Sequence, residues 1–214
     1  NKVKSFSSDI KMSNLTPPCF SIIIPCYNKA SYIEQTVESV ITQNCQDWEC
    51  IIIDDGSTDN SVEIIKKMAA MDSRIQTVFK TNSGVADTRN IGLLKASGKY
   101  VLFLDADDYI AKEKLEITLK EFEANSEMKV VYSNYSFVFA SDPYKKRNKS
   151  TFRTQIKGNP YLDMLTHWDE TLIIPIHSPV YDRQLLLENN IAFDKTLKNK
   201  EDWDFLLQVA AVTD

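Results

Sequence analysis

The sequence predicts an α/β fold with a mostly parallel central sheet flanked by helices, and three observations lead to this class. Strand-like and helix-like segments alternate along residues 19–126. The strand-like runs are apolar on both faces, which is typical of parallel strands covered by helices on both sides. Polar residues follow these runs directly, as they do where the edge of a sheet carries a ligand site.

The expected strands are short, apolar and rich in β-branched residues, and most of them end at a turn signal. The first, "CFSIIIPCYN", has three consecutive isoleucines before Pro25, and the second, "WECIIIDDGS", ends at Gly56. A weaker third run, a strong fourth run, "KYVLFL", and a longer β-rich run follow. These strands are expected at residues 19–28, 48–57, 74–80, 99–104 and 129–140.

The expected helices lie between the strands and carry apolar residues three and four positions apart. At the start of the first helix, Ser31 with Glu34 matches a capping box. Gly98 is expected to stop the third helix. We expect helices at residues 31–43, 59–71, 85–97 and 113–126, and shorter ones near residues 161–167, 182–189 and 201–212.

Composition narrows the classes of protein to which the chain can belong. Its 214 residues are 43% hydrophobic, which is enough for a core, and its net charge is −5. An acidic balance argues against nucleic-acid binding, so we interpret the basic run at residues 145–149 as a solvated loop. The four cysteines lack metal-ligand spacing, which favours reduced thiols.

Neither a membrane span nor a signal peptide is predicted. No stretch approaches the ~20 apolar residues that a membrane span needs. Residues 1–18 are polar and lack a signal-peptide core. The chain starts without Met and stops inside a helix-like pattern, so we expect a piece of a longer protein.

Acidic residues follow the second and the fourth strand-like runs. "DDGSTD" begins at Asp54 and "DADD" begins at Asp105, and the carboxyl ends of parallel strands meet at one edge of the sheet. In an extended segment, Asp105 and Asp107 would point to the same side, which suits a hard divalent cation. Such a cation would balance charges that otherwise repel each other and raise their pKa values. A solvated acidic turn is the alternative interpretation.

The residues near these acids indicate a nucleotide ligand. The chain has no P-loop pattern and no G-x-G-x-x-G after the first strand, which argues against dinucleotide binding. Tyr27 offers a ring that can stack on a base, and Asp55 offers a carboxylate that can accept a hydrogen bond from a base imide. A metal would then bridge the diphosphate of the nucleotide.

Four segments, in this order and spacing, resemble the family 2 glycosyltransferases with the GT-A fold. They are "SIIIPCYNKASYIEQTVESVITQ", "WECIIIDDGSTDNS", "GVADTRNIGLLKASGKYVLFLDADD" and "KEDWDF". The resemblance implies transfer from a nucleotide-sugar donor with inversion, a divalent metal (Mn²⁺ or Mg²⁺) as cofactor, and no covalent intermediate. It also implies an N-terminal extension (1–18) before a GT-A domain (19–214). That domain would have a Rossmann-like donor-binding half (19–108) and an acceptor-side half (109–214) truncated at its C-terminus.

The resemblance assigns roles to single residues as well. Asp202 would be the general base, Asp107 would bind the metal, and Asp105 would contact ribose or sugar and share the metal. The other donor-side residues would be Pro25, Tyr27, Asn28, Asp54, Asp55, Arg89 and Ala106. The acceptor or metal side would include His177, Glu201 and Trp203, with ordinary packing as the alternative for His177 and Trp203.

One residue departs from the family pattern. Asp87 in "GVADTRN" stands where the family more often has a small residue. An extra acid near the phosphates would weaken donor binding or alter the choice of sugar. We expect Asp87 to face solvent on its helix instead.

The chemistry implied by the resemblance needs few groups. A metal-bound diphosphate is a good leaving group without a general acid, whereas the acceptor hydroxyl needs a carboxylate within hydrogen-bond reach. A glycosidase would instead need an acid and a base on either side of the bond. Two other functions stay open. One is a sugar-phosphate nucleotidyltransferase, which would need a Gly-rich basic loop after the first strand, and the other is a catalytically inactive nucleotide-binding scaffold.

The resemblance finally implies partners and a location. The donor would be a UDP-sugar, and the acceptor a glycan or lipid-linked saccharide of bacterial cell-surface polysaccharide synthesis. Nucleic acid is not an expected partner. We expect the protein in the cytoplasm or at the cytoplasmic face of the membrane. Peripheral association with that membrane is an option for the full-length protein.

Overall fold

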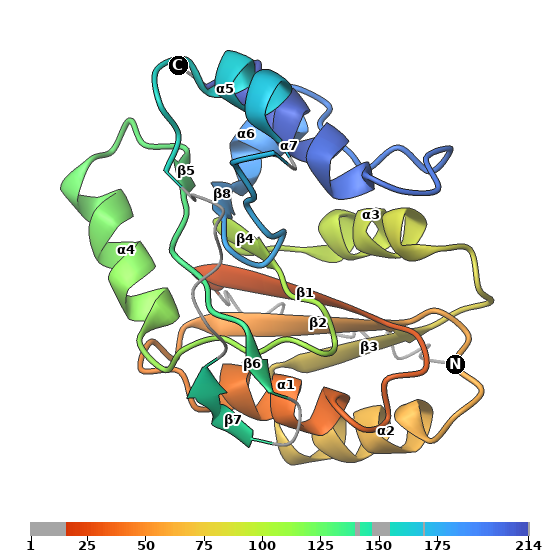
Figure 1. Ribbon diagram of the computed structural model, residues 1–214. Helices are drawn as coiled ribbons and strands as arrows, with labels where there is room; N and C mark the ends of the chain where they lie inside the picture. The colour runs from red at the N-terminus through yellow and green to blue at the C-terminus, as the bar shows by residue number, and fades with distance from the viewer. Residues whose placement is uncertain (1–15, 140–141, 147–154, 169, 214) are drawn as a thin grey trace, which may run out of the picture.

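A six-stranded sheet forms the centre of the molecule, for which a computed structural model describes residues 16–139, 142–146, 155–168 and 170–213. The strand order is β3-β2-β1-β4-β8-β5 (Figure 1). Four strands run parallel: β1 (Phe20–Cys26), β2 (Trp48–Asp54), β3 (Ile75–Phe79) and β4 (Tyr100–Phe103). The two others, β8 (Val180–Asp182) and β5 (Val130–Val131), are added by antiparallel pairing of β8 with β4 and of β5 with β8. The mostly parallel sheet is therefore confirmed.

Helices cover both faces of the sheet (Figure 1). The first face packs against α1 (Ile33–Ile41), α2 (Ser61–Met71) and α4 (Lys114–Ala124). The second face packs against α3 (Val85–Lys95), α6 (Arg183–Glu188) and α7 (Glu201–Ala210). The remaining helix, α5 (Pro160–His167), contacts α7.

The isoleucine runs lie in strands that are buried on both faces. Side chains alternate between the two faces of a strand, so every position of a strand that is covered on both sides is buried. In β1, Ile22 and Ile24 belong to the core on the α1 face, whereas Ile23 belongs to the core on the α3 face. The sheet thus separates two hydrophobic cores, and polar residues are left to the strand ends.

Two details of the predicted helix ends are wrong. α1 begins at Ile33 after Tyr32 without a side-chain cap, and Glu34 pairs instead with Lys67 of α2 at 2.8 Å. The predicted capping box of Ser31 and Glu34 is therefore absent. α3 ends at Lys95, before Gly98, whose added Cβ would lie 2.7 Å from the backbone of β1. Gly98 is needed for this close approach rather than for stopping a helix.

The predicted long β run at residues 129–140 is also wrong in extent. Of the described residues 129–139, only β5 and β6 (Val138–Phe139) are strands, and β6 pairs with β7 (Asp142–Lys146) in a separate two-stranded sheet. Between them, Ser133 exchanges hydrogen bonds with Ser178 instead of a strand neighbour. Buried Lys114 donates to both residues, and burial lowers the pKa of its ammonium to about 8.

Two sequence predictions fall partly on residues outside the described ranges. Residues 145–149 were expected to be a loop, but the first two belong to β7 and the last three lie outside the description. Of the predicted N-terminal extension, residues 1–15 lie outside it as well.

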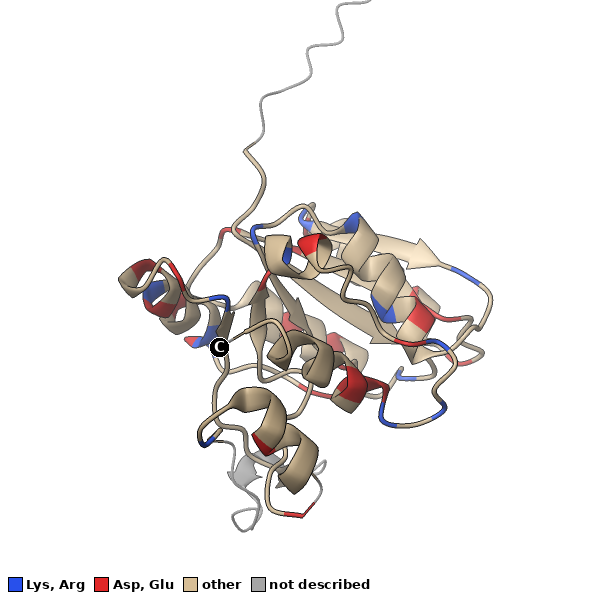
Figure 2. Ribbon diagram, turned by 90° about the horizontal axis from the view of Figure 1, so that it is seen from above, with Lys and Arg blue, Asp and Glu red and all other residues tan. Residues whose placement is uncertain are grey.

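The surface of the described residues mixes both signs of charge. Lysines and arginines are interspersed with aspartates and glutamates over the ribbon in Figure 2. Within the described ranges, every helix is too short or too polar to cross a bilayer.

The fit of α3 on the sheet gives a first prediction. A Cβ on Gly92 would lie 2.3 Å from Ile23 Cγ2 and 2.9 Å from Ile53 Cδ1, so α3 packs directly on β1 and β2 at this residue. Gly92→Ala should lower the free energy of unfolding by about 1–3 kcal/mol, because the added methyl overpacks the contact. Urea unfolding measures this change.

The matched control lies on the same helix. Leu94 is 82% exposed, so Leu94→Ala should leave the urea midpoint nearly unchanged. An unchanged midpoint for Gly92→Ala would contradict the tight contact between α3 and the sheet.

Candidate active site

A pocket of about 470 Å³ opens at the carboxyl ends of β1, β2 and β4. It collects predicted site residues from distant parts of the chain: Pro25, Tyr27, Asp55, Arg89, Asp105, Ala106 and Asp107. The other predicted residues do not line it. Asn28 and Asp54 lie in the supporting turns, Glu201 and Trp203 belong to α7 with Asp202, and His177 pairs with Asp108.

Asn28 connects the turn after β1 to the turn after β2. Its φ of 53° is a left-handed conformation that asparagine tolerates. Its side-chain oxygen accepts a hydrogen bond from the Thr58 N–H at 2.8 Å, and its own N–H donates to Ser57 Oγ at 2.9 Å. Tyr27 directly precedes Asn28, and 47% of its surface stays exposed at the pocket. Asn28 thus shapes the wall that presents the Tyr27 ring.

Asp54 shapes the turn at the end of β2. Its buried Oδ2 accepts hydrogen bonds from the Gly56 N–H at 3.2 Å and the Ser57 N–H at 3.0 Å. Its Oδ1 is buried and has no hydrogen-bond partner among the described residues. The carboxylate therefore acts on the backbone of the turn and does not line the pocket.

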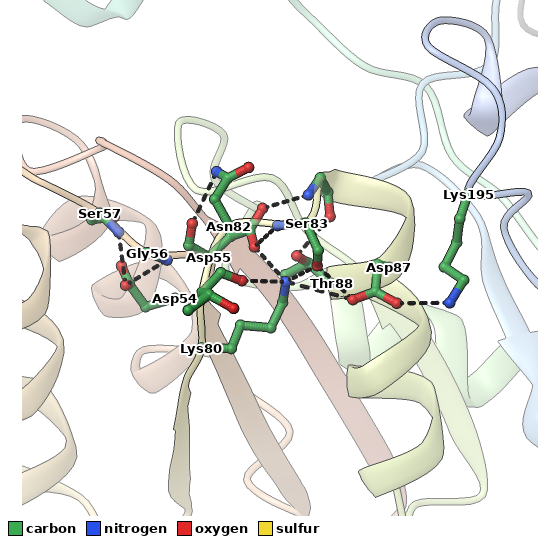
Figure 3. Close-up of polar contacts among 12 residues, drawn as sticks. Asp54, Asp55, Gly56, Ser57, Lys80, Asn82, Ser83, Asp87, Thr88 and Lys195 are labelled. Carbon is green, nitrogen blue, oxygen red and sulfur yellow. Dashed lines mark hydrogen bonds and ion pairs between the residues drawn. The ribbon is translucent and has the colours of Figure 1, made fainter.

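Asp55 holds the loop after β3 against the pocket (Figure 3). Its oxygens accept hydrogen bonds from the Ser83 N–H at 2.8 Å and the Gly84 N–H at 2.9 Å, and Lys80 Nζ pairs with it. A carboxylate offers about four acceptor positions, so one remains for a ligand. Asn82, which donates to the Asp55 carbonyl at 3.0 Å, brings a further amide to the pocket.

Asp87 is not directed to solvent as expected, because it sits in an ionic network (Figure 3). Ser83 Oγ donates to its Oδ2 at 2.6 Å, Lys80 Nζ lies 3.6 Å from the same oxygen, and Lys195 Nζ lies 3.2 Å from Oδ1. The Ser83 hydrogen bond and Lys195 lower the pKa of Asp87. Asp87 thereby ties the first turn of α3 to the loop that leads into α7.

The acidic segment after β4 is a turn. It is not the extended segment in which Asp105 and Asp107 were expected to point to the same side. The Asp108 N–H donates to the Asp105 carbonyl at 3.0 Å, which closes a turn around Ala106. Asp105 and Asp107 nevertheless both line the pocket. The shared edge of the sheet, not side-chain alternation, brings these two carboxylates together.

Each of the three aspartates in this turn faces its own basic side chain. These pairs are Arg89–Asp105 at 2.7 Å, His177–Asp108 at 2.7 Å, and Lys29–Asp107. The hydrogen bond to Asp107 raises the pKa of Lys29, which keeps its ammonium charged. Asp105 and Asp107 are therefore compensated by protein cations.

Arg89 links the pocket to α7. Its side chain is only 4% exposed, and its guanidinium donates to Asp105 at 2.7 Å and to Glu201 at 3.0 Å. Burial alone would lower the pKa of Arg89, but the two carboxylates outweigh burial and raise it. Glu201, the first residue of α7, is thus placed beside the acidic turn.

The start of α7 presents Asp202 in a partly buried position. Burial is the main cause that raises the pKa of the Asp202 carboxyl, and the charge of Glu201 adds to it. The hydrogen bond from the Trp203 N–H and the charge of Arg89 oppose the shift. The neighbouring Trp203 donates from Nε1 to the Met164 carbonyl at 3.4 Å and so packs against α5. This contact agrees with the packing interpretation of Trp203.

The lysines of the site were not predicted from the sequence. Lys29 and Lys80 carry no motif, because a single lysine after a strand is common on any surface. The excess of acids at the strand ends was the one signal for these lysines, because neighbouring carboxylates repel each other unless positive side chains lie nearby. Cys26 was also missed as a pocket residue. Burial raises the pKa of its thiol to about 11, so the thiol is neutral at physiological pH.

A ligand pocket with convergent acids at the carboxyl edge of a parallel sheet is typical of nucleotide-binding α/β enzymes. Residues 21–188 match the family model described as glycosyl transferase family 2. The chain belongs to that family.

Relatives and solved structures agree with this assignment. An uncharacterized glycosyltransferase of Haemophilus influenzae is 46% identical over 149 residues, which are 67% of this chain and 59% of that protein. Chondroitin synthase of Pasteurella multocida is 40% identical over 116 residues, which are 54% of this chain and 12% of the synthase. The crystal structure of S. aureus TarS in complex with UDP superposes with a TM-score of 0.70 at 27% identity, over 89% of this chain and 54% of that chain. The chain thus spans only part of its relatives, from 59% of the Haemophilus influenzae protein to 12% of the chondroitin synthase.

The raised pKa of Asp202 predicts a cost in stability. The native carboxyl keeps its proton at a pH where the unfolded chain has already lost it, so stability falls as pH rises from the ordinary Asp range through the native pKa. Asp202→Asn removes the buried charge and should raise the melting temperature at pH 7. The gain should shrink at acidic pH, and differential scanning calorimetry from pH 4 to pH 8 measures it. A lower melting temperature for the variant at pH 7 would contradict this prediction.

The Asp87 network predicts an effect on the loop before α7. Asp87→Ala and Lys195→Ala should each speed amide exchange in residues 194–200, by up to about five-fold for a surface ion pair. The double variant should add little to either one. Lys198→Ala removes another exposed lysine of the same loop and should leave exchange unchanged. Equal exchange rates in all four proteins would show that the pair does not hold the loop.

Proposed function

We propose that this chain is the catalytic domain of an inverting glycosyltransferase. It moves a sugar from a nucleotide-diphosphate sugar, with a UDP-sugar as the favoured donor, to a hydroxyl group of a glycan or lipid-linked saccharide. The observation that carries the proposal is the pocket in which Tyr27, Asp55, Asp105 and Asp107 meet and which Arg89 joins to α7. Membership in the family supports the reaction class.

The choice of donor and pathway draws on the relatives. TarS has been crystallised with UDP and with UDP-GlcNAc, which supports a UDP-sugar. A putative teichuronic acid biosynthesis glycosyltransferase of Bacillus subtilis, TuaG, is 43% identical over 122 residues, which supports a role in polysaccharide synthesis. A cytoplasmic location, at the membrane face or away from it, stays a prediction.

The donor occupies the half of the chain at residues 19–108 in this proposal. The exposed ring of Tyr27 can stack on the base, since every base offers a π-face. Asp55 keeps one acceptor position and can take a hydrogen bond from a base imide. Residues 109–214 then supply the acceptor side, including His177 and α7.

The residues present fit a divalent cation shared with the substrate. Asp105 and Asp107 offer carboxylate oxygens, the ligands that Mg²⁺ and Mn²⁺ prefer. Among the described residues, no group of three or more His, Cys, Asp or Glu forms a complete protein site. Such a pair suits a cation that also binds phosphate oxygens, as Mg²⁺ does in many phosphate-handling sites. When bound there, the cation would stabilise the charge of the leaving diphosphate.

Asp202 acts as the general base in the proposed mechanism. Its carboxylate takes the proton from the acceptor hydroxyl while the oxygen attacks the anomeric carbon and the nucleoside diphosphate leaves. The raised pKa makes Asp202 a stronger base than an ordinary aspartate, and a base is most effective when its pKa approaches the working pH. Arg89 keeps Asp105 and the start of α7 together, so the base stays near the donor pocket.

The proposal is tested by binding first. Thermal shift with UDP, GDP and other nucleoside diphosphates, with and without Mn²⁺, should show stabilisation by UDP that depends on the metal and grows with ligand concentration over Kd. If none of the nucleotides stabilises the protein, the proposal is wrong. Binding without transfer or donor hydrolysis across many sugars would favour the inactive scaffold.

Substitution of the base tests the mechanism. Asp202→Asn should leave UDP affinity within about two-fold and cut transfer by about 10²–10⁴-fold, because a general base contributes on that scale. Isothermal titration and a UDP-release assay measure the two quantities. Asp204→Asn is the matched control, since Asp204 lies on the same helix turn and bonds Gln208 at 2.7 Å. Undiminished transfer by Asp202→Asn would exclude Asp202 as the base.

A further inference from the structure

The two carboxylates that fit the cation are already neutralised by protein side chains. Arg89 pairs with Asp105, and Lys29 pairs with Asp107. All four side chains line the same pocket. Their formal charges are two positive and two negative. Asp55, the third carboxylate that lines the pocket, is paired with Lys80, so these charges balance when no ligand is bound.

The two protein cations differ in how firmly they are held. The Arg89 side chain is 4% exposed, bonds Glu201 as well as Asp105, and lies 5.2 Å from the centre of the Phe193 ring. Removing a buried guanidinium from two carboxylates would leave uncompensated charges, which is strongly unfavourable. Arg89 therefore stays with Asp105.

Lys29, in contrast, can exchange its partner. Its side chain is 36% exposed, and Asp107 at 41% exposure is its ion-pair partner. The Lys29 N–H donates to Ser61 Oγ at 2.9 Å, so the backbone is anchored while the four-carbon stem keeps its freedom. A half-exposed ion pair of this kind contributes little and breaks readily.

We propose that Lys29 is an exchangeable counter-ion, which neutralises Asp107 in the donor-free protein and turns to the donor's diphosphate when Asp107 binds a divalent cation. This inference rests on the proposed function. The inference assigns Lys29 a role in donor binding and gives a reason why metal and donor bind together.

Charge balance explains why the exchange couples the two ligands. A divalent cation alone would give the balanced pocket two extra positive charges and would have to displace the Lys29 ammonium. A donor diphosphate alone would add two negative charges beside Asp105 and Asp107. When both ligands are bound, their charges cancel, and the displaced Lys29 ammonium pairs with a phosphate oxygen. Metal and nucleotide should therefore bind with positive cooperativity.

The test measures Mn²⁺ binding to the protein by the electron paramagnetic resonance signal of free Mn²⁺, with and without UDP, after subtraction of the Mn²⁺ that UDP binds in protein-free samples. In the unsubstituted protein, UDP should tighten Mn²⁺ binding by about ten-fold or more, within the usual range of coupling between sites. In Lys29→Ala, Mn²⁺ affinity without UDP should rise by about two- to five-fold, because an exposed competing ion pair is gone. The tightening by UDP should shrink in the same variant.

Two further variants sharpen the test. Lys67→Ala removes an exposed lysine paired with Glu34 and should leave both Mn²⁺ affinities unchanged. Lys29→Gln removes the charge but keeps a polar stem, so it substitutes for Lys29→Ala if circular dichroism shows that the alanine variant does not fold.

The outcomes separate this inference from the proposed function. If the unsubstituted protein binds no UDP with Mn²⁺, the proposed function itself fails, and the inference with it. If it binds both, but a folded Lys29 variant shows the same Mn²⁺ affinity and the same tightening by UDP, the role of Lys29 is overturned while the transferase proposal stands.

Discussion

The buried guanidinium of Arg89 is the interaction on which the rest of the site depends. It lies between Asp105, which follows β4, and Glu201, which begins α7, with bonds of 2.7 Å and 3.0 Å. A buried charge is tolerated only when it is paired and hydrogen-bonded, so the three side chains stabilise one arrangement together. Sixteen positions separate Arg89 from Asp105, and 112 separate it from Glu201, so this contact joins the end of β4 to a helix far along the chain.

Helix α3 provides the frame that makes this interaction possible. Gly92 lets the helix lie directly on β1 and β2, which sets the depth of Arg89 relative to the strand ends. The next residue after Arg89 contributes as well, because the Asn90 side chain bonds the Phe193 backbone in both directions, at 2.8 Å and 2.9 Å. With Asp87 bound to Lys195, three neighbouring residues of one helix hold the segment that leads into α7. The asparagine and the arginine act through directed hydrogen bonds, whereas Asp87 adds a weaker link because its partner Lys195 is 63% exposed.

Charge compensation also explains how the protein tolerates so many acids in one place. Lysine and arginine side chains neutralise the carboxylates that line the pocket, so the fold does not require a bound cation to overcome their repulsion. Asp202, outside the pocket lining, differs, because burial raises its pKa and the Trp203 N–H hydrogen bond and Arg89 offset that shift only in part. A carboxylate held at a cost to stability is the kind of group that proton transfer needs.

The sequence by itself determined the class of fold, the order of its strands and helices from β1 to α4, and the acids at the strand ends. Apolar periodicity and turn residues are local signals, and the runs around Ile22–Ile24 and Ile51–Ile53 carry them without reference to the rest of the chain. Helix ends were less predictable, since Glu34 is bound by Lys67 of another helix instead of capping its own. Only the tertiary structure decided which base meets which acid. Lys29 and Asp107 are 78 positions apart, and no local pattern marks a lysine that will be brought to a carboxylate by the packing of parallel strands.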